Sequence, residues 1–154
     1  MNKYEQKACE YFRRGYNCAQ AVYAAFADKL GISEEQALRR SSAFGGGMGR
    51  MREVCGAVSA MVMVIGELYG YTDAEDNVAK KELYGYVQKV CDSFKDEYKT
   101  IICKELLNVK GESAFSPTPT ERTAKFYKER PCLGFVVSAA GILSDFIENK
   151  EKMA

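Results

Sequence analysis

Six cysteines are the residues of this 154-residue chain best suited to chemistry, and histidine is absent. The chain therefore lacks the commonest general base and the commonest transition-metal ligand, which excludes Ser-His and Cys-His nucleophiles. A metal site would have to use cysteine, carboxylate or methionine ligands. The same thiols could instead cycle between dithiol and disulfide.

Four of the cysteines fall at the expected starts of helices, where unpaired N–H groups and a partial positive charge favour the thiolate. A lowered pKa is what both a nucleophilic and a metal-binding cysteine require. We therefore predict that these four are the catalytic thiols or the metal ligands. They are Cys18, Cys55, Cys103 and Cys132.

The other two cysteines, Cys9 and Cys91, lie in the middle of expected helices and are predicted to be structural. The four candidates are separated by 37, 48 and 29 residues, which matches no compact zinc motif. The fold would have to bring four separate helix starts together. Four thiolates could then hold an iron–sulfur cluster or zinc, and two pairs could instead exchange with disulfides.

A glycine-rich stretch, FGGGMGRMREVCGAV, precedes the most apolar helix of the chain. We expect a loop here, because four glycines in five positions are costly inside a helix. The pattern fits neither a Walker nor a Rossmann phosphate loop, since no strand precedes it. Four of its residues are predicted to contact an anionic cofactor or substrate: Gly47, Gly49, Arg50 and Arg52. The two arginines and the helix start also favour Cys55 as the attacking thiolate.

Apolar residues recur with helical spacing along nearly the whole sequence, and no sustained alternation of period two is present. The sequence predicts an all-α fold: a compact bundle of six to eight helices, forming one domain over 1–154, with the glycine-rich loop before its central helix. Asn17 and Ser33 are expected N-caps, and Gly31 an expected C-cap. The expected helices cover 3–14, 17–31, 33–44, 52–69, 72–98, 103–107, 121–129 and 132–150.

The formal net charge is +1, from 22 basic and 21 acidic side chains. This balance argues against nucleic acid or a membrane surface as the main partner, which would need a clustered basic face. The first residues lack the apolar core of a signal peptide, and the longest uncharged apolar run, 54–66, is too short to span a bilayer. We therefore expect a cytoplasmic protein with reduced thiols.

The segments GYNCAQAV, FGGGMGRMREVCGAVSA and CKELL, together with Cys132, resemble a family of redox-active proteins named for its C_GCAxxG_C_C cysteine pattern. The resemblance covers nearly the whole chain. It implies a small helical protein with four characteristic cysteines, which correspond to the four candidates above. The family's CGAxxG motif is changed at one position, where Ala60 replaces the final glycine.

Similar cysteine-bearing segments accompany haem modules in split-Soret cytochromes, which look like iron–sulfur binders as well. This chain has no CxxCH motif and no histidine, so haem c with histidine ligation is excluded. The first hypothesis is an oxidoreductase or electron-transfer protein, with an iron–sulfur centre favoured over zinc and, narrowly, over thiol–disulfide exchange. The alternative is a non-catalytic binding module with a structural zinc–cysteine site. The partner would be a redox protein or a small molecule, and a homodimer could form through an exposed apolar face.

Overall fold

The computed structural model describes residues 1–154 and is all-helical, as the sequence predicts. Its only extended pairing is a single antiparallel bridge between Val54 and Ile102. The elements are α1 (Lys3–Arg13), α2 (Cys18–Ala25), α3 (Ala27–Leu30), α4 (Glu34–Ser41), η1 (Ser42–Phe44), α5 (Gly56–Tyr69), α6 (Asn77–Tyr98), α7 (Cys103–Leu107), η2 (Glu112–Phe115), α8 (Ala124–Glu129) and α9 (Cys132–Met153).

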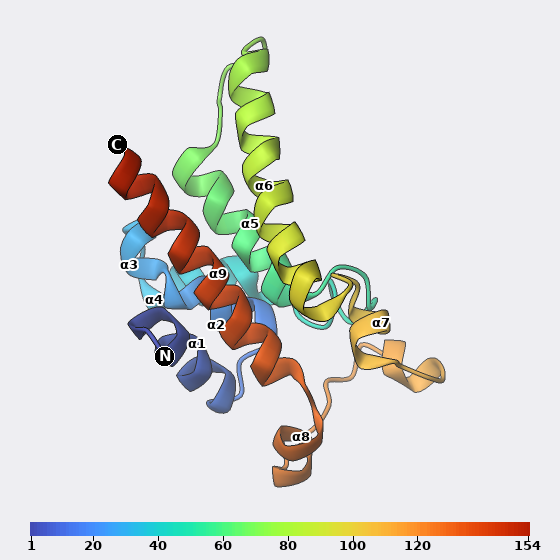
Figure 1. Cartoon of the computed structure of the whole chain (residues 1–154). Helices are drawn as coiled ribbons and strands as arrows, with labels where there is room; N and C mark the ends of the chain where they lie inside the picture. The colour runs from blue at the N-terminus through green and yellow to red at the C-terminus, as the bar shows by residue number, and fades with distance from the viewer.

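The core is built around α5, which packs against α2, α6 and α9, while α1 closes the bundle against α2 and α9 (Figure 1). Apolar residues occur around most of α5, so the helix must be covered on several sides. Val58, Met61, Val64 and Ile65 are fully buried. Each such side chain stabilises the fold by about 1.5–3 kcal/mol relative to an exposed position, which anchors α5 and fixes where its first turn lies.

The predicted caps of two helices are confirmed. Asn17 and Ser33 each accept a backbone N–H three residues on, and a glutamine at that position returns the hydrogen bond. Gly31 ends α3 in the left-handed conformation, as expected of a C-cap glycine. The expected helix over 17–31 is divided in two at Phe26, whose backbone leaves helical geometry between α2 and α3. This division raises the number of α-helices from the eight expected to nine.

Three helices begin at least three residues later than predicted. One is α8, which was expected at 121 and begins at Ala124, where the Thr123 side chain accepts the N–H of Phe126. The helix expected at 52 begins at Gly56, because Arg50 and Arg52 have positive φ and extend the loop. The helix expected at 72 begins at Asn77, where the Asp76 side chain accepts the N–H of Ala79.

The longest apolar helix is α9 rather than the run over 54–66. It has 22 residues and is apolar enough, by length and composition, to cross a membrane. In this fold it packs along α1, α2, α5 and α6 and buries Val136, Ala139 and Leu143. It is therefore a core helix of the bundle.

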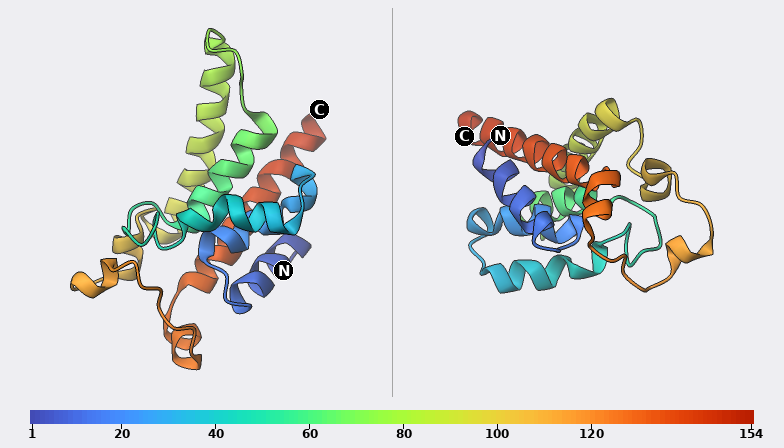
Figure 2. Two further views of the ribbon diagram at one scale, coloured as in Figure 1. Left: turned by 180° about the vertical axis from the view of Figure 1, so that it is seen from behind. Right: turned by 90° about the horizontal axis from the view of Figure 1, so that it is seen from below.

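The segment between α6 and α9 lies outside the bundle. Figures 1 and 2 show α7, η2 and α8 strung along a path that leaves the helices and returns to the start of α9. This segment covers the end of the bundle at which α2, α5 and α9 begin.

Candidate functional site

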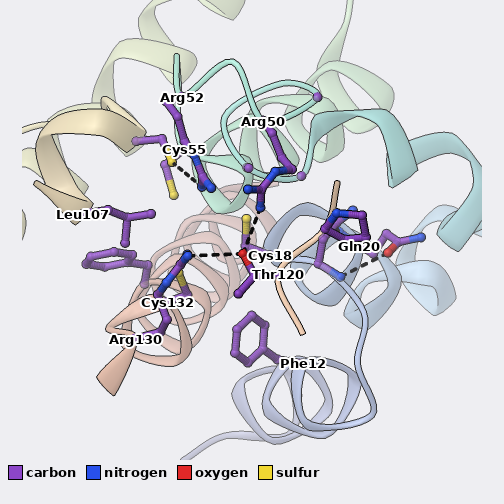
Figure 3. A pocket seen from close by; sticks show the side chains of 18 of the residues that line it. Phe12, Cys18, Gln20, Arg50, Arg52, Cys55, Leu107, Thr120, Arg130 and Cys132 are labelled. Atoms are coloured by element: carbon purple, nitrogen blue, oxygen red, sulfur yellow. Dashed lines mark hydrogen bonds between the residues drawn. The ribbon is translucent and has the colours of Figure 1, made fainter. Parts of the chain in front are cut away.

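A cavity of about 660 Å³ lies where α2, α5, α7 and α9 begin. All four predicted cysteines line it, and we call it the cysteine cavity; Figure 3 shows Cys18, Cys55 and Cys132 around it. Cys9 and Cys91 do not line it. The fold thus brings together the four helix starts that are far apart in sequence and leaves the two mid-helix thiols elsewhere.

Short backbone pairing sets Cys55 beside Cys103. The bridge joins Val54 to Ile102, and each cysteine follows one of these residues. The N–H of Cys55 donates to Ile101 O at 2.7 Å, and the N–H of Cys103 donates to Glu53 O at 2.6 Å. The start of α7 is thereby held beside Cys55, the N-cap residue of α5.

The glycine-rich loop turns with a left-handed backbone. Besides three of its glycines, Met48, Arg50 and Arg52 have φ between 60° and 67°. Left-handed backbone costs a residue with a Cβ about 1–2 kcal/mol, so the loop holds strain that its surroundings must offset. Such strain in a native protein is typical of functional sites.

Two glycines of this region are required by close approach to a cysteine. A Cβ on Gly47 would lie 2.7 Å from the Cβ of Cys103, and one on Gly56 would lie 2.6 Å from the sulfur of Cys18. Of the residues predicted to contact a cofactor, Gly49, Arg50 and Arg52 line the cavity. Gly47 does not line it and instead lies behind Cys103.

Cys18 is the activated thiol of the cavity. A hydrogen bond from the Cys55 thiol is the main reason that the pKa of Cys18 falls from 9.0 to about 6. Backbone N–H groups from the loop and from two helix starts also donate to this sulfur, and together with the Cys55 thiol they outweigh the opposing effect of burial. These are the N–H groups of Gly46, Ala19 and Gly56.

Cys55, the attacking thiolate predicted from the sequence, has surroundings that favour its protonated form. The hydrogen bond that it shares with Cys18, together with burial, raises the pKa of Cys55 well above its ordinary value. It is 4% exposed, and the buried guanidinium of Arg52 contacts Cys103 rather than Cys55. The positive charge near Cys55 in sequence is thus directed to another cysteine in space.

The two remaining thiols of the cavity are protonated at neutral pH. Burial raises the pKa of Cys103, although the Arg52 guanidinium, 3.7 Å from its sulfur, opposes this. Burial and the nearby charge of Cys18 raise the pKa of Cys132 to about 11. The negative charge of Cys18 contributes to the raised pKa of both groups.

Four arginines line the cavity, and no aspartate or glutamate does. Arg50 and Arg52 come from the loop, as predicted. Sequence reasoning missed Arg122 and Arg130, which come from the irregular segment before α9. Their segment could have been recognised from its position in the sequence, because it connects Cys103 to Cys132 and must lie near both.

The arginines of the loop hold the outer segment over the cavity. Arg50 donates to Ser116 O at 2.6 Å and to Thr120 Oγ1 at 3.0 Å. Arg52 donates to Ala114 O at 2.9 Å. Figure 3 shows Arg50 and Arg130 meeting at Thr120 on the cavity side.

No three cysteine or carboxylate side chains are close enough to bind a single metal ion. Cys18 and Cys55 are hydrogen-bonded neighbours, whereas Cys103 and Cys132 reach the cavity from α7 and α9. Glu53, a conceivable ligand or base from its position near Cys55, is exposed and absent from the cavity wall.

One protein-family model matches most of the chain. A family model described as "Putative redox-active protein (C_GCAxxG_C_C)" matches residues 16–146, which include all four cysteines of the cavity. No curated protein and no solved structure matches the chain.

Proposed function

Because the chain belongs to the C_GCAxxG_C_C family of redox-active proteins, we propose that its four cavity cysteines together form one redox centre, as the ligands of an iron–sulfur cluster. One observation carries this proposal: all four thiols line a single cavity that contains four arginines and no carboxylate. A simple dithiol would use only two of these thiols.

The donor set suits a cluster. Such a cluster supplies one-electron transfer when bound, and its potential depends on charge and on hydrogen bonds to sulfur. Backbone N–H groups already donate to Cys18, and Arg52 donates to Cys103. The guanidinium groups would offset the negative charge of four thiolates.

Zinc is a weaker candidate. A tetrahedral zinc ion holds each sulfur at about 2.3 Å, which requires its ligands to converge on one point. The thiols lack that convergence. A bridged cluster spreads its ligands over a wider space, which suits cysteines supplied by the starts of four separate helices.

A second candidate function is thiol–disulfide exchange, and the hydrogen bond between Cys55 and Cys18 favours it. The Cys18 thiolate would attack a substrate disulfide, forming a mixed disulfide and releasing one thiolate. Cys55 would then lose its proton and attack the Cys18 sulfur, which releases the second thiolate. The substrate disulfide is reduced by two electrons, and Cys18 and Cys55 are oxidised to a disulfide.

Anaerobic purification followed by counts of iron, acid-labile sulfide and free thiols tests the proposal. A cluster predicts a brown protein with iron and sulfide in equal amounts and with visible absorption that bleaches on reduction. A colourless, metal-free protein that loses two thiols on mild oxidation would support exchange instead. Zinc without sulfide would support the non-catalytic binding module.

A further inference from the structure

Arg52 is buried in a way that its known contacts do not explain. Its side chain comes from the strained loop, and the residue is only 2% exposed. Nε donates to Ala114 O, and Nη1 faces the sulfur of Cys103 at 3.7 Å. Nη2 has no partner, and it is the only buried side-chain nitrogen or oxygen in the protein without one. A charged donor buried without an acceptor is unfavourable, so this position calls for a hydrogen-bond acceptor.

The surroundings of Arg52 also favour an anion. Arg50 and Arg130 share Thr120 on the same cavity, and burial together with the charges of Arg52 and Arg130 lowers the pKa of Arg50. No acidic side chain on the wall balances these charges. In Figure 3, Arg52 and Arg50 extend from the loop toward the thiols.

One part of the wall is apolar. Phenylalanines from α1, α8 and α9 line it, together with leucines of α7, and the cavity of about 660 Å³ is large enough for a small organic molecule. The phenylalanines are Phe12, Phe126 and Phe135.

We propose that the cysteine cavity binds a small organic anion, whose carboxylate or phosphate group accepts a hydrogen bond from Nη2 of Arg52. Its apolar part contacts the phenylalanine wall. The anion then lies beside Cys103 and within the redox site, as a substrate would. This inference goes beyond the redox centre itself, because it holds whether the cysteines bind a cluster or exchange with disulfides.

Calorimetric titration of the full-length, anaerobically purified protein tests this site. The probes are benzoate and phenyl phosphate, with benzamide as a neutral molecule of similar shape. The variants are Arg52→Gln and, as a matched control, Arg39→Gln, which removes an exposed arginine paired with Glu35. Iron, sulfide and thiol counts on each preparation show separately whether the redox centre is present.

We expect at least one of the two anions to bind the wild type at least tenfold more tightly than benzamide. Arg52→Gln should weaken that binding at least tenfold, and Arg39→Gln should leave it unchanged. The anion that binds more tightly shows whether the site prefers a carboxylate or a phosphate group. Equal binding of anion and amide, no binding of either anion, or unchanged binding in Arg52→Gln would overturn the proposal. If Arg52→Gln does not fold, the comparison of anion with amide in the wild type still shows whether the cavity prefers an anion.

Discussion

The two walls of the cysteine cavity are built differently. The inner wall consists of the starts of α2 and α5, two helices that pack on each other and carry the fully buried Val22 and Val58. The outer wall consists of α7 and the segment 111–130, which lies outside the bundle in Figure 2. Polar bonds from Arg50 and Arg52 hold much of it in place.

The inner wall fixes the geometry of the site, whereas the outer wall controls access to the cavity. The inner wall sets the position of the activated Cys18 through the same packing that stabilises the fold. The outer wall is held by hydrogen bonds from one strained loop to 111–120 and by contacts of Arg122, Phe126 and Tyr127 with α1. Its exposed part over 111–120 should therefore open at a lower free energy than the core. A redox centre can thus stay rigid while the cavity beside it admits a partner.

Gly56→Ala tests the inner wall most severely. The new Cβ would lie 2.6 Å from the Cys18 sulfur and 2.8 Å from Phe44 O, and backbone cannot move away easily. We expect a loss of about 3 kcal/mol in the free energy of unfolding and loss of the redox centre. Gly66→Ala, where the Cβ meets open space in the same helix, should stabilise by about 0.5–1 kcal/mol. Urea unfolding measures both, and equal effects would contradict close packing at Cys18.

The pH dependence of thiol reactivity sharpens the contrast between Cys18 and the other thiols. In reduced, metal-free protein, alkylation of Cys18 by iodoacetamide should reach half its maximal rate near pH 6, well below that of any other cavity cysteine. Because folding lowers this pKa from 9.0, the folded state binds fewer protons between pH 6 and 9. The contribution of Cys18 to stability is therefore full above pH 9 and is lost as the pH falls through 6.

Peptide mapping by mass spectrometry assigns the alkylated cysteine at each pH. A midpoint for Cys18 near 9, or faster labelling of Cys55 at pH 7, would show that the thiolate is not held at Cys18.

Arg50→Gln should have the smallest effect and the most local one. It removes the hydrogen bonds to Ser116 O and Thr120 Oγ1. We expect faster amide exchange over 111–120 and a loss of about 1 kcal/mol or less in the free energy of unfolding. Arg39→Gln should change neither quantity. Unchanged exchange over this segment in Arg50→Gln would mean that the loop does not hold the outer wall.

Sequence patterns predicted the inner wall well. Helical periodicity gave the all-α fold, and the Asn17 cap placed Cys18 at the start of α2. These features depend on neighbouring residues, so they can be recognised in a sequence. The clustering of the cysteines was an inference from helix starts and family resemblance, and it needed the fold to bring them together.

The outer wall and the charge of each thiol could not be predicted. Arg122 and Arg130 reach the cavity because the segment 111–130 folds back over it, and no periodic pattern marks such a path. The pKa of Cys18 is lowered because Cys55 and Gly56 approach it from another helix. The path of this segment and the pKa of Cys18 both depend on contacts between elements that are distant in sequence. Local sequence patterns do not reveal such contacts.

Serine substitution of single cysteines, followed by counts of iron, sulfide and redox-active thiols, tests the central claim most directly. The claim is that one redox centre uses the four cavity cysteines and neither of the other two. Cys18→Ser, Cys55→Ser, Cys103→Ser and Cys132→Ser should each lose the centre, whereas Cys91→Ser should retain it. Retention of a full centre in any of the four, or equal loss in Cys91→Ser, would contradict the account.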